Sequence, residues 1–351
     1  MRSSSGSFVR HAVALCLMVW LVGVGCAAPA PAPSAAPAPQ QSTVVSPTAE
    51  PLDIVVSYSN LSTDQWPVWI AYDEGLFTRH GLNVDLRLLE STTGVAALLA
   101  GESQAAIIGG SEIMAAAAEG ADVAIVGGLS RTFSFRFMAP PQIQSPQDLR
   151  GRRVGVSRFG SSSDIATRVA LQRLGLNPGQ DVEIVQVGSL TARMQALESG
   201  AIQGAVAMPP ETTRLTRAGN HVLFDLSDLD LPAATAVMAV RRSDISSRRP
   251  MVQAFVDAMV EAIALQRRDP ERAQAVLSRW FKTDDQEALQ EAWSFYAEKV
   301  LATIPRVEVA QLETARQIMA AQSPRIAQYD PQQLIDNSFV DSAVARGLAG
   351  Q

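Results

Sequence analysis

The segment Ser157-Arg-Phe-Gly-Ser-Ser-Ser163 has the residue types best suited to ligand chemistry. Its glycine permits close approach of the backbone, and its serines offer hydroxyl donors directly ahead of an expected helix. The positive end of a helix and such donors suit a carboxylate, a sulfonate or a similar oxyanion. We therefore expect Ser157, Arg158, Ser161 and Ser162 to contact a ligand. Two alternatives stay open: a serine here only caps the helix, and Arg158 is a solvated surface cation.

Other loops that follow expected strands are further candidate positions, because ligands of open α/β sheets bind beyond the carboxyl ends of the strands. Thr92 and Thr93 also offer hydroxyl donors beside a glycine, and form a weaker candidate for the same kind of oxyanion contact. Tyr58 and Trp66 would provide an aromatic wall, although Trp66 can instead fix the start of a helix beside the proline that follows it. The remaining candidates in these loops are Asn60, Ser111, Pro209 and Glu211.

Catalytic groups are not recognisable in these loops. Glu90, Glu112 and Glu211 each stand alone, without a nucleophile–base pair or a carboxylate dyad. The two cysteines, Cys16 and Cys26, both lie near the N-terminus, so the body of the chain has no thiolate to offer. We accordingly expect a protein that is not an enzyme.

The net charge and the positions of the histidines indicate which classes of partner the chain lacks. The formal net charge is −6, and no basic stripe indicates a nucleic-acid surface. His80 and His221 have no neighbour at metal-ligand spacing, which favours solvated or capping roles. We expect no nucleic acid, metal or cofactor.

Short β-rich runs alternate with helical patterns from residue 53 to residue 240, which predicts parallel sheets covered by helices on both faces. From residue 250 onward the pattern is helical. We expect strands at 53–58, 83–89, 105–108, 123–126, 153–156, 182–187, 204–207 and 234–240. We expect helices at 67–77, 94–100, 113–118, 161–174, 190–199, 211–218, 286–301 and 309–320.

Two stretches of the chain can be laid over each other. In each, a Gly-Leu-Asn turn leads to an Ala-Leu-x-x-Gly turn, then a glutamine and a strand of small residues; the glutamines are Gln104 and Gln203. This predicts two similar lobes, the first from 51–138 and 234–351 and the second from 139–233. The two crossings between them are expected near residues 138–141 and 230–233. Each glycine taken singly is equally compatible with plain helix capping.

The N-terminus has the layout of a secretory leader, with Arg2 and Arg10 ahead of an uncharged apolar run. Gly23-Val-Gly-Cys26 resembles the lipobox of bacterial lipoproteins, which usually has Leu where Gly23 stands. We predict a lipoprotein signal peptide at 1–25, lipid on Cys26 and a Pro/Ala-rich linker at 26–50. The alternative is ordinary cleavage nearby, for example after Ala28. Both place the body outside the cytoplasmic membrane, in the cell envelope.

Three blocks of sequence resemble the substrate-binding proteins of ABC importers for nitrate, taurine and alkanesulfonates, a family that also includes proteins for thiamine pyrimidine precursors. The most specific is Ile143-Gln-Ser-Pro-Gln-Asp-Leu-Arg-Gly-Arg-Arg-Val-Gly-Val156. The others are residues 71–84, with Glu74-Gly-Leu-Phe77, and Met208-Pro209. The family usually has Asp where Gln104 and Gln203 stand, a structural position.

The resemblance implies an α/β, two-lobed type II periplasmic binding protein fold with two hinge crossings and C-terminal helices packing back on the lobes. It implies a monomer that hands a small solute to an ABC permease and its ATPase. The serine segment favours a sulfonate, nitrate or other small organic anion. Tyr58, Trp66 and Phe159 would instead favour a pyrimidine or another planar heterocycle. An envelope enzyme on the same fold and a sensor domain are the alternatives from other classes.

Overall fold

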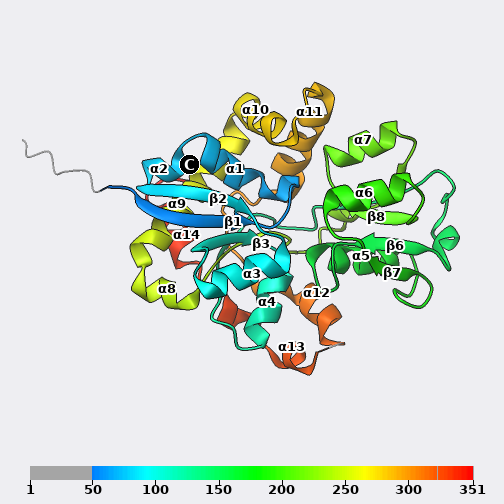
Figure 1. Ribbon diagram of the computed structural model, residues 1–351, viewed down its shortest axis with the longest axis horizontal. Helices are drawn as coiled ribbons and strands as arrows, with labels where there is room; N and C mark the ends of the chain where they lie inside the picture. The colour runs from blue at the N-terminus through cyan, green and yellow to red at the C-terminus, as the bar shows by residue number, and fades with distance from the viewer. Residues whose placement is uncertain (1–49, 322, 351) are drawn as a thin grey trace, which may run out of the picture. The chain divides into compact units, whose positions relative to one another are not determined.

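The computed structural model describes residues 50–321 and 323–350, which form two five-stranded sheets flanked by helices (Figure 1). The predicted signal peptide, the predicted lipid site at Cys26 and the linker up to residue 49 lie outside the described residues. Within the described residues, none of the helices is long and apolar enough to span a membrane.

The first sheet is built from β1 (Leu52–Tyr58), β2 (Leu82–Leu88), β3 (Ala105–Ile108), β4 (Ala124–Gly128) and β10 (Val237–Val240). The second consists of β5 (Arg136–Ala139), β6 (Arg153–Val156), β7 (Glu183–Gln186), β8 (Gly204–Ala207) and β9 (His221–Asp225). The strand orders are β2-β1-β3-β10-β4 and β7-β6-β8-β5-β9. We call each sheet with its helices a lobe.

The two lobes share one topology, as the paired sequence segments predict. In each sheet one strand is antiparallel to both of its neighbours: β10 between β3 and β4, and β5 between β8 and β9. The expected parallel pairing holds for β1 with β2 and β3 and for β6 with β7 and β8, but it is wrong for β10 and β5. The physical reason is that β5 and β10 are the strands that the chain forms directly after it crosses from the other lobe.

The first crossing lies earlier than the sequence predicts. Because β5 belongs to the second sheet, the chain leaves the first lobe within residues 129–135, before the expected crossing at 138–141. It returns within residues 226–236. The two crossings run side by side: the Thr132 hydroxyl donates to the Leu231 carbonyl (2.9 Å), and the Thr235 amide donates to the Ser130 hydroxyl (2.8 Å). Two adjacent extended segments of this kind can serve as a hinge.

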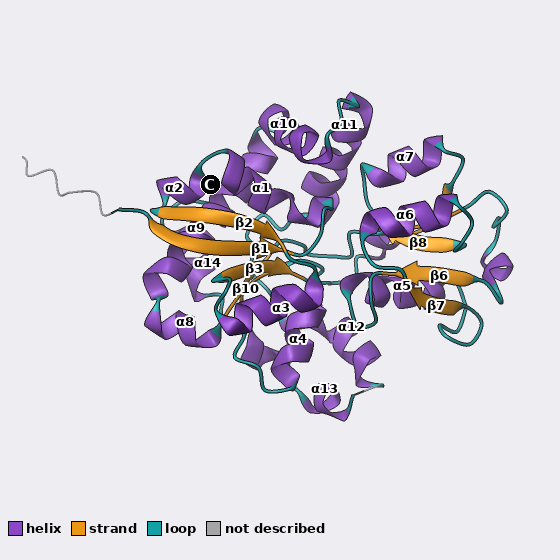
Figure 2. Ribbon diagram, viewed as in Figure 1, coloured by secondary structure: helices purple, strands orange, loops and turns teal. Residues whose placement is uncertain are grey.

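The helices α5 (Ser162–Arg173), α6 (Leu190–Glu198) and α7 (Glu211–Arg217) lie with the second sheet (Figure 2). The predicted helix at 67–77 is divided at Gly75, whose φ is +66°. The predicted helix at 286–301 is α-helical only to Ser294 and continues as a π-helix over Phe295–Val300.

The helices of the first lobe are α1 (Trp66–Asp73), α2 (Leu76–Arg79), α3 (Ser91–Ala100), α4 (Gly110–Ala118), α8 (Arg242–Ser247), α9 (Arg249–Arg268), α10 (Pro270–Phe281), α11 (Gln286–Ser294), α12 (Val309–Ala320), α13 (Pro324–Gln328) and α14 (Ser338–Ala345).

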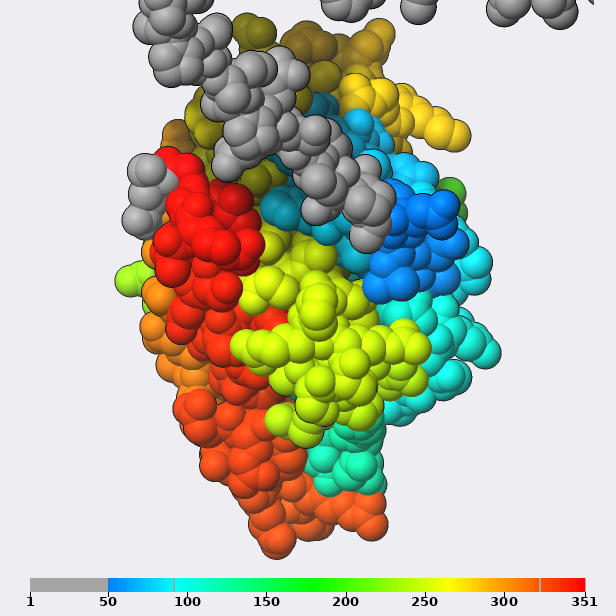
Figure 3. Space-filling model, turned by 90° about the vertical axis from the view of Figure 1, so that its left-hand side faces the viewer, coloured from blue at the N-terminus to red at the C-terminus, as the bar shows by residue number. Residues whose placement is uncertain are grey.

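The end of the first lobe that faces away from the second sheet gathers distant parts of the chain. Figure 3 shows the start of β1 (blue), α8 (yellow-green) and the C-terminal residues (red) together on this face. The C-terminal helix α14 packs on α9 and on β4. The last helices of the chain therefore complete the first lobe.

Gln104 and Gln203 occupy equivalent positions in the two lobes. The Gln104 side chain accepts a hydrogen bond from the Val55 amide in β1 (2.8 Å) and donates to the Gly101 carbonyl at the end of α3 (2.8 Å). Gln203 makes the corresponding bonds between β6 and the end of α6, at 3.3 and 2.8 Å. Each amide thus ties a helix end to an equivalent strand of its sheet, β1 in the first and β6 in the second, a structural role that serves both lobes alike.

Candidate functional site

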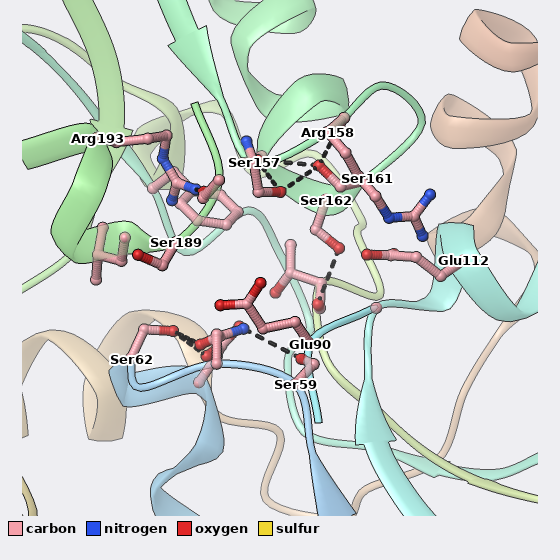
Figure 4. Close-up of a pocket in the computed structure, with 18 of the residues that line it drawn as sticks. Ser59, Ser62, Glu90, Glu112, Ser157, Arg158, Ser161, Ser162, Ser189 and Arg193 are labelled. Atoms are coloured by element: carbon pink, nitrogen blue, oxygen red, sulfur yellow. Dashed lines mark hydrogen bonds between the residues drawn. The ribbon is translucent and has the colours of Figure 1, made fainter. Parts of the chain in front are cut away.

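A cavity of about 190 Å³ lies where the carboxyl ends of the strands of the two sheets face each other (Figure 4). Residues after β1, β2 and β3 line it from the first lobe: Ser59, Asn60, Ser62, Asp64, Glu90, Thr92, Thr93, Gly109 and Glu112. Residues after β6, β7 and β8 line it from the second lobe: Ser157, Arg158, Ser161, Ser162, Ser163, Gly188, Ser189, Leu190, Arg193 and Met208. The crossings contribute Phe135 and Thr235. This is the position in which open α/β sheets bind ligands.

Seven residues proposed from the sequence as ligand contacts line this cavity. They come from three loops that are far apart in the chain, and the fold brings them together because each loop follows a strand. They are Asn60, Thr92, Thr93, Ser157, Arg158, Ser161 and Ser162.

The serine segment before α5 forms a hydrogen-bonded cluster. The Ser157 hydroxyl donates to Ser161 Oγ (2.8 Å), and the Ser157 amide donates to Ser163 Oγ (2.9 Å). The Ser161 Oγ also accepts from the Asp164 amide (3.3 Å), so Ser161 does cap α5. Gly160, with φ of +77°, permits the turn that leads into the helix. The segment is therefore held rigid at the wall of the cavity.

Tyr58 and Trp66 do not line the cavity. Trp66 is fully buried and its indole N–H donates to the Ala273 carbonyl (3.0 Å). Tyr58 contacts Trp69 and Trp280 edge-on, with ring centroids 5.9 and 5.7 Å away, and burial raises the pKa of its phenol. Both rings pack inside the first lobe, because the large apolar faces are more stable there than at a polar cavity.

Ser111, Pro209 and Glu211 also lie outside the lining. The Ser111 hydroxyl donates to Glu112 Oε2 (2.8 Å), and Glu211 forms an ion pair with Arg214 (3.0 Å). The Pro209 carbonyl accepts a hydrogen bond from the Thr63 hydroxyl (2.8 Å), which joins the two lobes. Phe159 is an exposed surface residue, so Phe135 is the one aromatic side chain among the described residues that line the cavity.

Arg193 is a cavity residue that the sequence analysis missed. It lies within α6, not in a loop, and its side chain is only 5% exposed. One terminal nitrogen donates to the Gly188 carbonyl (2.9 Å), while Nε has no hydrogen-bond partner among the described residues. Burial lowers the pKa of the guanidinium to about 10, an effect opposed by the charges of Asp64 and Glu90, so it stays cationic at neutral pH. The sequence did contain a signal for this residue, because Arg193 stands among the apolar residues of the predicted helix at 190–199.

Asp64 and Glu90 supply negative charge from the first lobe. Asp64 lies in the short 3-10 helix Thr63–Gln65, is buried, and accepts a hydrogen bond from the Ser62 hydroxyl. Burial raises the pKa of its carboxyl to about 6. The Glu90 side chain, just before α3, is directed into the cavity (Figure 4). Neither was predicted, because each acid stands alone in the sequence.

Gly109 lets the two lobes approach each other closely. A Cβ at this position would clash with the Glu112 carboxylate of α4 and with the Ser162 hydroxyl of α5. Ser162 in turn donates to the Thr235 carbonyl (3.1 Å) in the return crossing. The absence of a side chain at Gly109 is thus what allows groups from both lobes to meet at this edge of the cavity.

The cavity has the composition of a polar binding site. Its described lining contains hydroxyls, the carboxylates of Asp64, Glu90 and Glu112, and the guanidiniums of Arg158 and Arg193. It contains no described cysteine or histidine, and the described residues include no cluster suited to a metal ion. Such a lining can bind and orient a small polar molecule.

The chain is similar in sequence to one protein family and in structure to several solved proteins. The family model described as NMT1/THI5 like matches residues 62–273. A protein from Bordetella bronchiseptica RB50 shares 19% identity and a TM-score of 0.73, over 84% of this chain and 97% of that chain. The alkanesulfonate-binding protein SsuA from Xanthomonas axonopodis pv. citri, bound to MOPS, shares 16% identity and a TM-score of 0.64, over 84% and 98%.

The desulfurization enzyme DSZB has the same fold, with 18% identity and a TM-score of 0.62 over 84% of this chain and 99% of that chain. No curated protein sequence matches this chain significantly. The structural matches confirm the predicted α/β, two-lobed periplasmic binding protein fold.

Proposed function

The chain belongs to the NMT1/THI5-like family, and on that premise we propose that it is an extracytoplasmic solute-binding protein of an ABC importer. It captures a small solute between its lobes and delivers it to a permease powered by an ATPase. The observation that carries the proposal is the cavity, which is lined from both lobes and flanked by two crossings that can act as a hinge.

Contacts across the mouth of the cavity support a form in which the lobes have closed. Besides the bond from Thr63 to Pro209, Arg136 of β5 forms an ion pair with Glu291 of α11 (2.5 Å). Arg217 of α7 pairs with Asp285 and Glu287. The Arg217 pairs are largely exposed and the Arg136 pair is partly exposed, and ion pairs in such positions are individually weak, so these pairs oppose opening only slightly. Easy opening is what capture and release of a solute require.

The second-lobe wall favours a ligand with an anionic group. The first turns of α5 and α6 face the cavity through Ser162, Ser163 and Ser189, and helix N-termini stabilise anions. The buried Arg193 adds a cation whose Nε has no hydrogen-bond partner in the described part of the chain. A sulfonate, carboxylate or similar oxyanion thus fits this wall, as the serine segment predicted. Phe135 alone gives a planar heterocycle less to stack on.

We propose binding rather than turnover, although DSZB has the same fold. The described lining has no cysteine or histidine, so nucleophilic catalysis would need a group that the cavity does not offer. Incubating the purified protein with each ligand that it binds tests this point. Chemical change of that ligand would support the alternative of an envelope enzyme.

The sequence adds a proposal about location. Lipid on Cys26 anchors the protein, as a monomer, to the outer face of a membrane, and the residues after Cys26 form the spacer. Mass spectrometry of the N-terminal peptide from membrane-fractionated protein checks this: a diacylated Cys26 is expected, and an unmodified N-terminus after Ala28 would contradict it.

The binding function is tested by a thermal-shift panel of sulfonates, nitrate, carboxylates, amino acids and pyrimidines. A ligand at 100 times its dissociation constant stabilises the folded protein by about 2.7 kcal/mol. At least one member of these classes is expected to raise the melting temperature. If no small solute of any class does so, the proposed function is wrong.

A further inference from the structure

Building on the proposed function, we propose that the solute is a small zwitterion, which places its anionic group on the second-lobe wall and a cationic group against Glu90. The proposal concerns the ligand class of the same cavity. It goes beyond the anion that the serine segment suggests.

Positive and negative charges lie on opposite walls of the cavity. The first lobe contributes three carboxylates, from Asp64, Glu90 and Glu112. The second lobe contributes two guanidiniums, from Arg158 and Arg193. With all five groups ionised, the described lining has a net charge of −1, and the charges are segregated by lobe. A solute held between the lobes therefore faces acid on one side and base on the other.

The Arg193 guanidinium has a hydrogen-bond donor left over for a ligand. Its side chain is 95% buried, and its Nε hydrogen-bonds to none of the described residues. A buried donor that has lost its water and found no partner is unfavourable, so this atom points to an acceptor supplied by the ligand. Arg158 has a buried Nε without a described partner as well. Both atoms support an anionic group on the second-lobe wall.

Glu90 presents an exposed carboxylate to the cavity (Figure 4). None of the side-chain hydrogen bonds and ion pairs of the described residues involves this carboxylate. Its charge acts on Arg193 across the cavity. When a solute fills the space between them, water that now solvates the Glu90 carboxylate must leave. A carboxylate that loses water needs a cation or donors in its place.

Neither a plain anion nor a plain cation satisfies both walls. A plain anion would satisfy Arg193 but would enter a cavity of net negative charge and leave Glu90 without a counterion. A plain cation would satisfy Glu90 but leave the buried guanidinium nitrogens without an acceptor. A zwitterion satisfies both walls and adds no net charge. An ammonium or guanidinium group joined by a short chain to a sulfonate or carboxylate has this chemistry.

The test compares matched probes by isothermal titration calorimetry. The first set is 3-aminopropane-1-sulfonate, propane-1-sulfonate and propylamine, and the second is 4-aminobutanoate, butanoate and propylamine. In at least one set the zwitterion is expected to bind at least tenfold more tightly than the anion of the same length. Glu90→Gln should remove most of that preference while leaving the affinity for the plain anion unchanged or increased.

Glu102→Gln is the matched control, because Glu102 is an exposed acid just beyond the opposite end of α3. It should leave all affinities unchanged. If plain anions or neutral solutes bind as tightly as the zwitterions, or if Glu90→Gln leaves the preference intact, the inference is wrong while the binding function stands. If no probe and no member of the wider panel binds to folded protein, the proposed function fails and the inference fails with it.

Discussion

The Ser162 hydroxyl donates a 3.1 Å hydrogen bond to the carbonyl of Thr235, and so joins the first turn of α5 to the return crossing. Thr235 is itself held by Ser130 of the other crossing, through its amide (2.8 Å) and its hydroxyl (2.8 Å). The cavity-lining serines of the second lobe are therefore connected directly to the proposed hinge. A ligand that contacts this turn of α5 can bias the position of the lobes.

Replacing Gly109 with alanine should weaken ligand binding without unfolding the protein. The added Cβ would displace the Glu112 carboxylate and the Ser162 hydroxyl, and the hydroxyl would lose its hydrogen bond to Thr235, so the lobes could not close as tightly. We expect about a tenfold loss of affinity, or about 1.4 kcal/mol. The free energy of unfolding in urea should change by less than about 1 kcal/mol. Full affinity in this variant would show that the edge at Gly109 is not needed for closure.

Asp64 should make folding stability depend on pH. Burial disfavours the charged form and raises the pKa of its carboxyl from the ordinary value of 3.8 to about 6 in the folded protein. The folded state therefore binds more protons than the unfolded state between these values, and stability falls as the pH rises from about 4 to about 6. Two pKa units correspond to about 3 kcal/mol. Urea unfolding at several pH values measures this slope.

Asp64→Asn is the control for that slope. The amide cannot titrate, so the variant should lose the decline between pH 4 and 6 while keeping the fold. If the decline persists in Asp64→Asn, another group is responsible and the buried, shifted carboxyl is not its cause.

Arg193→Met should reduce the affinity for an anionic or zwitterionic ligand. A hydrogen bond to a charged group contributes about 2 kcal/mol, so the dissociation constant should rise about thirtyfold. Methionine fills much of the same volume on the apolar face of α6. Arg173→Met, at an exposed position near the end of α5, is the matched control and should bind normally. Equal affinities for the two variants would remove Arg193 from the site.

Glu291→Gln should favour the open form. The substitution weakens the ion pair with Arg136 (2.5 Å) and the hydrogen bond from Thr213, both of which connect the second lobe to α11. Partly exposed ion pairs contribute up to about 1 kcal/mol, which corresponds to about a fivefold loss of affinity. Small-angle X-ray scattering should show a larger radius of gyration for the ligand-free variant than for the wild type. An unchanged radius together with unchanged affinity would contradict a role in closure.

The sequence was sufficient for the repeated part of the fold. The strands at 105–108, 153–156 and 204–207 have the predicted bounds, because each is a short buried run between turn signals. β5 and β9 were missed. The last residues of β5 directly precede Pro140 and Pro141 and were interpreted as a crossing. The strand pairs with β8 and β9, which lie some 65 or more residues later in the chain, so no local pattern indicates it.

The cavity was predicted only where local rules apply. Loops after strands are recognisable, and they supplied Asn60, Thr92 and the serine segment. Arg193 lies inside a helix, and it reaches the cavity only because the lobes face each other. Tyr58 ends β1 and packs into the core, whereas its neighbour Ser59 lines the cavity. Which of two adjacent residues faces a ligand depends on tertiary packing.

The most direct test of a solute held between the two lobes is calorimetric titration of the wild type and of Arg193→Met with the tightest-binding solute of the panel. The account predicts one site per chain in the wild type and about a thirtyfold weaker site in the variant. Binding of equal strength in both proteins, or no binding by the wild type, would contradict it.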